Sequence, residues 1–524
     1  MERAAGILLP VPALPGPFGI GTLGAEARHF VDRLAKAQIS YWQVLPLGQP
    51  AEDSELENSP YKSYSAFAGN TWLIDPQEIC DDLGLLDPDE IRNFLCYDDG
   101  YLVDYQFARH NSANYLGLAF SRLDADLLAE VRQFLNQETW LLDYATFLCC
   151  KDEFDGLPWY EWPEEIRQRD LNALNLFQRE HAQNILYVAF CQWLFYRQWQ
   201  NLRNYANERG VCIFGDIPIY VASDSCDIWS RPELFDLDEE RRPRSVAGVP
   251  PDYFAQDGQL WGNTLYNWEA MAADGYQWWL DRIAQSMRLY DRLRIDHFRA
   301  FHTYWAVPAS AETAREGAWR QGPGLKLFQL VKERLGDLDI VAEDLGDIDE
   351  GVRDFLRQTG FPGMKVMQFA FDPKGDGSEL PHHYIHHCCA YTGTHDNDTL
   401  FGWLWNASPE ERDYALRYFN FPAEANWQQG GYHSPICRHI IRHLWASVAD
   451  FVCIPVQDLC GFGSDTRVNV PGQPDNCWRF RVTRSALEQA DFAWLKDMNV
   501  LYQRAGETKD LPSEDNALDL YAFL

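Results

Sequence analysis

Several features that would define a class of function are scarce or missing in this sequence. Only 45 Lys and Arg residues stand against 78 Asp and Glu, which gives a formal net charge of −33. A surface this acidic repels phosphate backbones and anionic lipids, so we expect neither nucleic acid nor a membrane surface as a partner. No apolar run reaches the roughly 18 residues that a membrane span requires. The first residues also lack the pattern of a secretory signal.

The cysteines do not form a disulfide framework. There are 13 of them, an odd number, at irregular spacings. Together with the lack of an export signal, this predicts reduced thiols and a cytoplasmic protein. A glycine-rich phosphate loop is missing as well, so we expect no nucleotide and no other cofactor.

The densest group of candidate metal ligands is one short His/Cys run: His382, His383, His386, His387, Cys388 and Cys389. Its spacing matches neither CxxC nor HExxH. We therefore favour a loop that leads into a buried strand, with a metal site as the weaker alternative, and we assign no metal ligand.

Aromatic residues are abundant instead, with 20 Trp, 25 Tyr and 30 Phe. Most of them must pack in the core. The flat faces of Trp and Tyr also stack on sugar rings, so the count fits a protein that handles carbohydrate.

Eight short apolar runs are rich in β-formers and too short for helices. They cover residues 6–9, 39–47, 211–220, 293–298, 339–343, 364–371, 390–395 and 451–457. Amphipathic stretches such as 25–37 and 324–334 lie between them. The alternation predicts an α/β fold, a (β/α)8 TIM barrel. A doubly wound open sheet is the alternative, and it is disfavoured because no GxGxxG follows any of the strands.

The spacing of the strands predicts two large insertions, after strands 2 and 3. The first, about residues 76–205, is mostly helical, with amphipathic periodicity at 127–136, 141–151 and 179–209. The second, about residues 222–290, contains Pro- and Gly-rich stretches such as VAGVPPDYFAQDGQLWG, and we expect loops that cover the active site. Residues 1–524 are otherwise predicted to form one catalytic barrel.

Four acidic residues lie near the ends of predicted strands: Asp216, Asp296, Glu343 and Asp396. The ends of barrel strands converge on one pocket. Glycoside chemistry needs one carboxylate to attack or stabilise the anomeric centre and a second, protonated carboxyl to protonate the leaving oxygen. A single carboxylate at a strand end is more often a helix cap or a solvated loop residue. Four together favour a catalytic site.

Arg294 precedes Asp296 by two residues. The two-residue period of a strand places both side chains on the same face. A guanidinium there would keep Asp296 ionised, as a nucleophile requires.

The chain resembles the amylomaltases, which are 4-α-glucanotransferases of the α-amylase clan and are called disproportionating enzymes in plants. The resemblance rests on a series of segments in the same order: GILLPVPALPGPFGIGTLG, YWQVLPLG, SPYKSYSAFAGN, GDIPIYVASDS, VAGVPPDYFAQDGQLWGNTLY, RIDHFRAF, VAEDLG, YTGTHDND and IPVQDLCGFGSDTRVNVPG. The segment TRVNVPGQPDNCW departs from the family pattern at Val468, Gln473 and Cys477.

The resemblance implies a role for each matching residue. Asp296 would be the nucleophile, Glu343 the general acid and base, and Asp396 the residue that holds sugar hydroxyls and stabilises the transition state. Five further residues would support these groups or contact the glucan: Arg294, His395, Asp216, Tyr61 and Trp261.

The reaction that the resemblance implies is transfer of an α-1,4-glucan segment to the 4-hydroxyl of glucose or another glucan. The substrates would be α-1,4-glucans and maltooligosaccharides, and a retaining geometry predicts a carboxyl separation of about 5–5.5 Å. Three alternatives remain at this point: an α-amylase-type hydrolase, a branching enzyme and a non-catalytic glucan-binding protein. The resemblance implies no calcium requirement.

Overall fold

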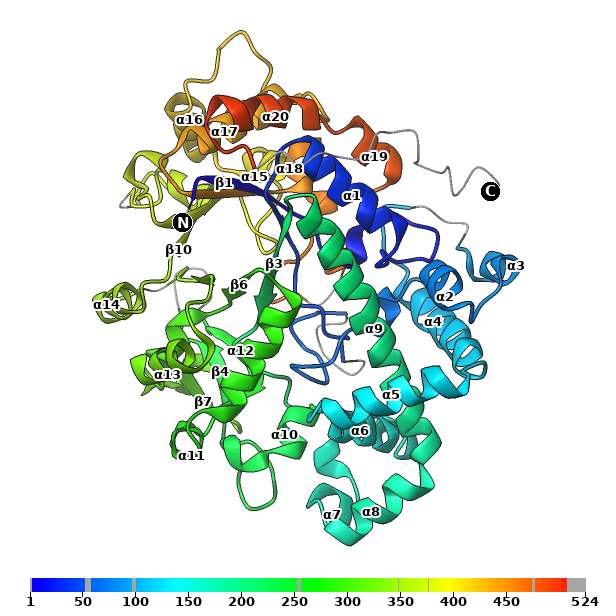
Figure 1. The fold of residues 1–524 in the computed structure, drawn as a ribbon. Helices are drawn as coiled ribbons and strands as arrows, with labels where there is room; N and C mark the ends of the chain where they lie inside the picture. Colours follow the sequence, from blue (N-terminus) through cyan, green and yellow to red (C-terminus); the bar gives the residue numbers. More distant parts are fainter. Residues whose placement is uncertain are drawn as a thin grey trace.

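The computed structural model describes residues 2–51, 58–96, 100–251, 256–346, 348–375, 377–473 and 476–506. At its centre lies an eight-stranded parallel sheet (Figure 1). Its strands are β1 (Ala4–Leu8), β2 (Tyr41–Gln43), β3 (Cys212–Ile217), β6 (Arg292–Ile295), β9 (Ile340–Ala342), β10 (Gly363–Val366), β11 (Cys388–Tyr391) and β12 (Phe451–Pro455).

The strands follow one another around the sheet in chain order, and β12 pairs with β1. Strand β9 lies next to the start of β10, where the Ala342 amide donates to the carbonyl of Pro362, the residue before β10 (2.9 Å). The sheet therefore curls into a nearly closed barrel, and the predicted (β/α)8 barrel is confirmed.

Side chains fill the interior of the barrel, so it is a packed core with a site at one end. Inward-facing residues form their own buried cluster, apart from the residues that face the helices: Ala4, Leu8, Phe214, Val341, Met364, Cys389, Tyr391, Phe451 and Cys453. The next residues along β1, Ala5 and Ile7, belong to the larger core beneath the helices. This alternation follows from the two-residue period of a strand.

Amphipathic helices cover the outside of the barrel. They include α1 (Ala25–Lys36), α12 (Gln277–Leu289), α13 (Leu325–Leu335) and α14 (Glu350–Thr359). Helix α14 illustrates the local signals: the Asp349 side chain accepts from the Val352 amide at its N-terminus, and Gly360 ends it with φ +73°.

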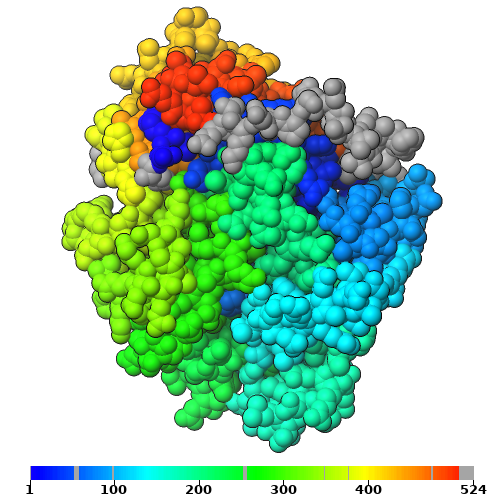
Figure 2. All heavy atoms as spheres, viewed as in Figure 1, coloured from blue at the N-terminus to red at the C-terminus, as the bar shows by residue number. Residues whose placement is uncertain are grey.

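The segment between β2 and β3 is built from helices. They are α2 (Pro76–Leu83), α3 (Pro88–Ile91), α4 (Tyr105–Phe120), α5 (Ala125–Gln137), α6 (Leu141–Glu153), α7 (Glu164–Arg167), α8 (Leu171–Glu180) and α9 (Ala182–Glu208). Figure 2 shows the cyan and blue-green atoms of this region packed against the green atoms of the segments that follow β3.

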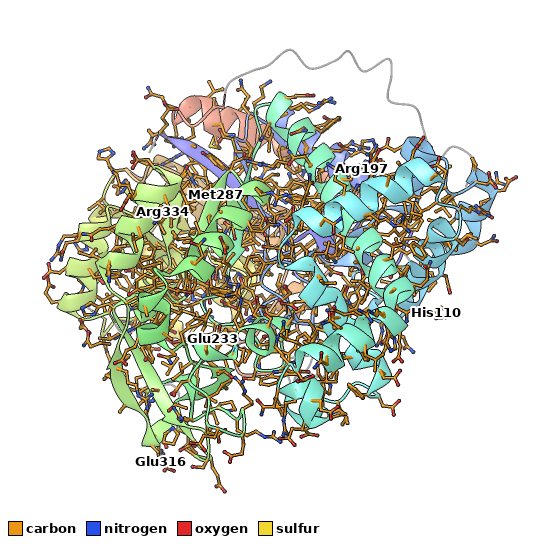
Figure 3. The ribbon with its side chains drawn as sticks, turned by 60° about the horizontal axis from the view of Figure 1, so that its bottom comes forward. His110, Arg197, Glu233, Met287, Glu316 and Arg334 are labelled. Carbon is orange, nitrogen blue, oxygen red and sulfur yellow. The ribbon has the colours of Figure 1, made fainter. Side chains whose placement is uncertain are left out.

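Residues 222–290, expected to be loop-rich, also contain regular structure. They hold α10 (Cys226–Ser230), α11 (Trp268–Ala273), α12 and two strands, β4 (Ser245–Val249) and β5 (Gln259–Thr264). These strands join β7 (Thr303–Pro308) and β8 (Ala318–Gln321) in an antiparallel sheet with the order β5-β4-β7-β8. In Figure 3, Glu316 marks the far end of this small sheet and His110 marks the helical insertion. The expectation of loops was incomplete, because β4 and β5 pair with each other and β4 also pairs with β7, which follows barrel strand β6.

The segment after β11 carries α15 (Leu400–Asn406), α16 (Pro409–Tyr418) and α17 (Pro435–Ala446). Helices α18 (Val456–Cys460), α19 (Arg484–Gln489) and α20 (Phe492–Leu501) follow β12. The predicted strand over 364–371 ends at Val366, because residues 367–371 turn into a 3₁₀-helix. All thirteen cysteines lie in the described ranges as free thiols. Across those ranges, we find no helix with the length and apolarity needed to cross a membrane.

Candidate active site

The four predicted carboxylates converge at the carboxyl end of the barrel. Asp216 lies in β3, Asp296 follows β6, and Glu343 follows β9. The register brings them together: the Asp296 amide donates to Ile217 O (3.0 Å), and the Glu343 amide donates to Ile295 O (3.0 Å). Adjacent parallel strands thus present their terminal acids to one pocket, as a barrel requires.

Arg294 bridges two of these carboxylates. Its Nη1 donates to Asp216 Oδ2 (2.6 Å) and its Nη2 donates to Asp296 Oδ1 (2.7 Å). The guanidinium and Asp216 are almost fully buried, whereas 28% of the Asp296 side chain is exposed. Burial raises the pKa of Asp216, and the positive charge of Arg294 opposes this shift. Asp296 is therefore the member of this trio that a substrate can reach.

Glu343 is held by two backbone donors. The His297 amide donates to Oε2 (2.7 Å) and the Leu345 amide donates to Oε1 (2.8 Å). Burial, followed by the negative charge of Asp296, raises the pKa of Glu343 to about 8. The carboxyl is thus protonated at neutral pH, while Asp296 lies beside a guanidinium. This is the separation of roles that acid and nucleophile chemistry needs.

His297 connects this pair to the small sheet. Its backbone is left-handed (φ +49°), and its amide donates to Glu343. Its ring lies edge-on to the ring of Trp261 on β5, with centroids 4.8 Å apart. Burial lowers the pKa of His297 to about 4, so the ring is neutral at neutral pH. The small sheet therefore places an aromatic residue directly beside the carboxyl pair.

Asp396 lies in a separate network on the other side of the pocket. Its Oδ1 accepts from Asn469 Nδ2 (2.6 Å), its Oδ2 lies 3.3 Å from His395 Nε2, and its carbonyl accepts from Arg467 Nη2 (2.5 Å). Sequence reasoning did not identify Arg467 or Asn469. The sequence feature that could have identified them is the segment TRVNVPG, which follows the last barrel strand. The loops that follow barrel strands form the active sites of such folds.

An aromatic wall joins the two halves. The Tyr61 hydroxyl donates to Asp216 Oδ2 (2.7 Å), and its ring stacks on the His395 ring with centroids 5.2 Å apart. Trp478 completes the wall, 5.6 Å from Tyr61 and 5.8 Å from His395 between ring centroids. All eight residues singled out from the sequence thus belong to one connected group. The expected carboxyl separation stays a prediction.

The His/Cys run has ordinary structural contacts. His382 Nδ1 pairs with the Tyr418 hydroxyl (2.9 Å), His383 Nδ1 with Gly377 O (2.8 Å) and His387 Nε2 with Gly360 O (2.9 Å). Within the part of the chain that the structure describes, no three His, Cys, Asp or Glu side chains are grouped so that they could hold a metal ion.

Comparison with known sequences identifies relatives along most of the chain. The family model Glyco_hydro_77, described as 4-alpha-glucanotransferase, matches residues 9–487. A 4-alpha-glucanotransferase of Thermus thermophilus is 41% identical over 510 residues, 95% of this chain and 98% of its own. One of Clostridium butyricum is 40% identical over 474 residues, covering 90% and 94%. A chloroplastic/amyloplastic one of Solanum tuberosum is 40% identical over 492 residues, covering 92% and 83%.

Solved structures agree with these sequence relatives. Amylomaltase from Streptococcus agalactiae, solved in complex with acarbose, superimposes with a TM-score of 0.91 at 38% identity and covers 96% of this chain and 100% of its own. Amylomaltase from Corynebacterium glutamicum shares the fold, with a TM-score of 0.77 at 17% identity over 96% of this chain and 75% of its own. The resemblance seen in the sequence is confirmed: the chain belongs to the 4-alpha-glucanotransferase family and is an enzyme of that type.

Proposed function

We propose that the enzyme transfers α-1,4-glucan segments by a retaining double displacement, with Asp296 as the nucleophile and Glu343 as the general acid and base. One observation carries this proposal: a buried carboxyl whose pKa is raised to about 8 lies at the same end of the barrel as a carboxylate bound to Arg294. An acid beside a nucleophile is the pairing that retaining glycoside chemistry requires.

In the first half of the reaction, Asp296 Oδ attacks the anomeric carbon of the donor glucan. The bond from that carbon to the glycosidic oxygen breaks as Glu343 gives its proton to the leaving oxygen. In the second half, Glu343 takes the proton of an incoming 4-hydroxyl, whose oxygen displaces Asp296. Two inversions restore the α configuration. The scheme uses only side chains of this protein and no cofactor.

We assign the remaining residues to substrate binding and charge control. Asp396, fixed by Asn469 and His395, would hold sugar hydroxyls as the anomeric centre flattens. The ring faces of Tyr61 and Trp261 would contact glucose rings, which are amphipathic in the same way as the aromatic side chains.

The acidic character of the chain supports a neutral substrate. A net charge of −33 disfavours nucleic acid and anionic lipid, whereas an uncharged glucan is unaffected. The free cysteine thiols support a cytoplasmic location.

Trapping the covalent intermediate tests the proposed roles. A donor with a fluoride leaving group, such as α-maltotriosyl fluoride, needs no proton from the general acid. The Glu343→Gln variant should therefore form the adduct with this donor and release it slowly. Peptide mass spectrometry should find one maltotriosyl unit on the peptide that contains Asp296, and Asp296→Asn should abolish it. An adduct on another residue would refute the nucleophile assignment.

A further inference from the structure

Three aromatic rings form a patch on the surface outside the catalytic pocket. Phe401 and Trp405 lie on α15, and Trp427 lies in the gold loop that projects at the top of Figure 1 between α16 and α17. The centroids of the Phe401 and Trp405 rings are 6.0 Å apart, and those of Trp405 and Trp427 are 5.6 Å apart. Trp405 is 52% exposed, which is unusual for so large an apolar side chain. We call these three residues the aromatic patch.

The patch is held in place by Arg412 of α16. The Arg412 guanidinium lies over the Trp427 ring, 4.9 Å from its centroid. Its Nη1 also donates to the Trp405 carbonyl (3.4 Å) and to the Ala407 carbonyl (3.1 Å). One half-buried arginine thus contacts both tryptophans and fixes them relative to each other. The planes of the two indoles meet at 53°; Trp405 is exposed, and Trp427 is half-buried. Rings fixed before binding lose little conformational entropy when they bind a ligand.

The patch is continuous with the catalytic loop. Helix α15 begins four residues after Asp396 and spans about 10 Å at 1.5 Å per residue. At its far end, Asn406 Nδ2 donates to Asp398 Oδ2 (3.1 Å) and to Ser464 Oγ (3.1 Å). Ser464 Oγ also donates to Asp398 Oδ2 (2.8 Å). The residue next to Trp405 is therefore hydrogen-bonded to the loop that carries Asp396.

From this geometry we infer that the aromatic patch is a secondary binding site for an α-1,4-glucan chain that extends out of the catalytic pocket. Exposed indoles offer flat faces to sugar rings. Glu410 and Glu411 lie in the first turn of the adjacent helix α16, and their negative charges disfavour an anionic ligand. A neutral polymer of glucose, already held by the enzyme at Asp396, fits both conditions.

The inference rests on the proposed function and adds a second contact to the same substrate. A donor that is too short to reach from the pocket to α15 gains nothing from the patch. A long chain held at two points binds with higher overall affinity than at either point alone. The patch should therefore affect reaction with amylose and leave reaction with maltotriose unchanged.

The test compares Trp405→Ala and the double variant Trp405→Ala/Trp427→Ala with the wild type on both donors. Trp319→Ala is the matched control, because Trp319 on β8 is similarly exposed (42%) but lies on the small sheet. We expect the double variant to raise KM for amylose roughly tenfold, equivalent to about 1.4 kcal/mol. The kcat and KM for maltotriose should not change. The Trp405→Tyr variant keeps a flat ring, so its KM for amylose should be much closer to the wild-type value than that of Trp405→Ala.

Glucan binding without turnover separates this inference from the proposed function. All proteins in this test carry Glu343→Gln, so they bind glucan without turning it over. In gels that contain amylose, the migration of the Trp405→Ala/Trp427→Ala protein should be retarded less, whereas that of the Trp319→Ala protein should be retarded as before. Unchanged retardation and an unchanged amylose KM would overturn the inference, while maltotriose turnover would still support the proposed function. If the double variant changes only the oligomeric state in size-exclusion chromatography, the patch is an interface between copies of the chain and the inference is wrong.

Discussion

At the scale of single residues, the surroundings of Glu343 determine its pKa and therefore its proposed role. An exposed glutamate would ionise near pH 4.5 and could not deliver a proton at neutral pH. Burial and the neighbouring Asp296 move its pKa to about 8, and the positive charge of Arg294 and the backbone donor of Leu345 only partly oppose this shift. The proton is therefore available where the reaction needs it.

This shift predicts the pH dependence of activity. Glu343 must be protonated for the first step, so kcat/KM should be high below pH 8 and should fall as the pH rises through about 8. A pH–rate profile measured with maltotriose checks this. A basic limb near pH 5 would show that Glu343 titrates like an exposed carboxyl.

The raised pKa of Glu343 also makes the free energy of unfolding depend on pH in a defined direction. Since the folded-state pKa lies above the ordinary 4.5, Glu343 favours the folded state most below pH 4.5. That contribution is lost as the pH rises toward 8. Urea unfolding of Glu343→Gln and wild type between pH 4.5 and 8 should show a smaller pH dependence in the variant. Parallel curves would contradict the raised pKa.

Arg294 provides a second prediction at this scale. Its guanidinium bridges Asp216 and Asp296 while 4% exposed, so its removal leaves the fully buried Asp216 carboxylate without a positively charged partner. Arg294→Met should lower the free energy of unfolding by roughly 3–5 kcal/mol and abolish activity. Arg357 is the matched control, because it also bridges two carboxylates, Glu350 and Asp354, but on the surface. Arg357→Met should leave both properties unchanged, and equal losses in the two variants would contradict the account.

Residue patterns in the sequence were sufficient to predict much of the candidate active site. The two-residue period placed Arg294 beside Asp296, and the hydrogen bond between them bears this out. The partners of Asp396 were not predictable in this way. Asn469 and Arg467 reach it across more than 70 residues of chain, from the loop after another strand. Contacts between loops of different strands depend on the closed barrel and leave no local periodicity.

At the scale of elements, β3 shows how packing positions a catalytic side chain. Gly215 precedes Asp216 in this strand, and a Cβ atom there would lie 2.1 Å from Cγ of the buried Tyr290. Strand β3 can approach the Tyr290 ring only because residue 215 has no side chain. Any larger residue must displace either the ring or the strand that carries Asp216.

This packing predicts opposite effects for two Gly→Ala changes. Gly215→Ala should lower the free energy of unfolding by about 1–3 kcal/mol through overpacking and should reduce activity. Gly117→Ala, in the exposed interior of α4 where a Cβ meets no atom within 4 Å, should raise it by up to about 1 kcal/mol. Urea unfolding measures both. A stabilising Gly215→Ala would show that β3 is not packed this tightly.

The small antiparallel sheet marks the limit of prediction for elements. The barrel strands were found because each is a local apolar run. Strands β4 and β5 lie among prolines and glycines, and β4 lies between β5 and β7, which follows in the chain only after β6. Trp261 was therefore assigned by resemblance alone, and its contact with His297 became visible only in the folded sheet.

At the scale of the whole molecule, the excess of acidic residues dominates the electrostatics. A net charge of −33 places many like charges on one compact surface, where they repel one another. Salt screens this repulsion between exposed charges over about 10 Å at 0.1 M. We expect the thermal unfolding midpoint to rise as NaCl increases from 0.02 to about 0.3 M. A fall of the midpoint over this range would mean that surface ion pairs outweigh the repulsion.

The central claim is that the connected carboxylate site transfers glucan segments to sugar hydroxyls. The most direct test incubates the purified protein with maltotriose alone, resolves the products by size and assays reducing ends. We predict glucose and a ladder of longer maltooligosaccharides at a nearly constant number of reducing ends. Shorter products only, with rising reducing ends, would make water the acceptor and contradict transfer, and no reaction at all would contradict a catalytic role for the site.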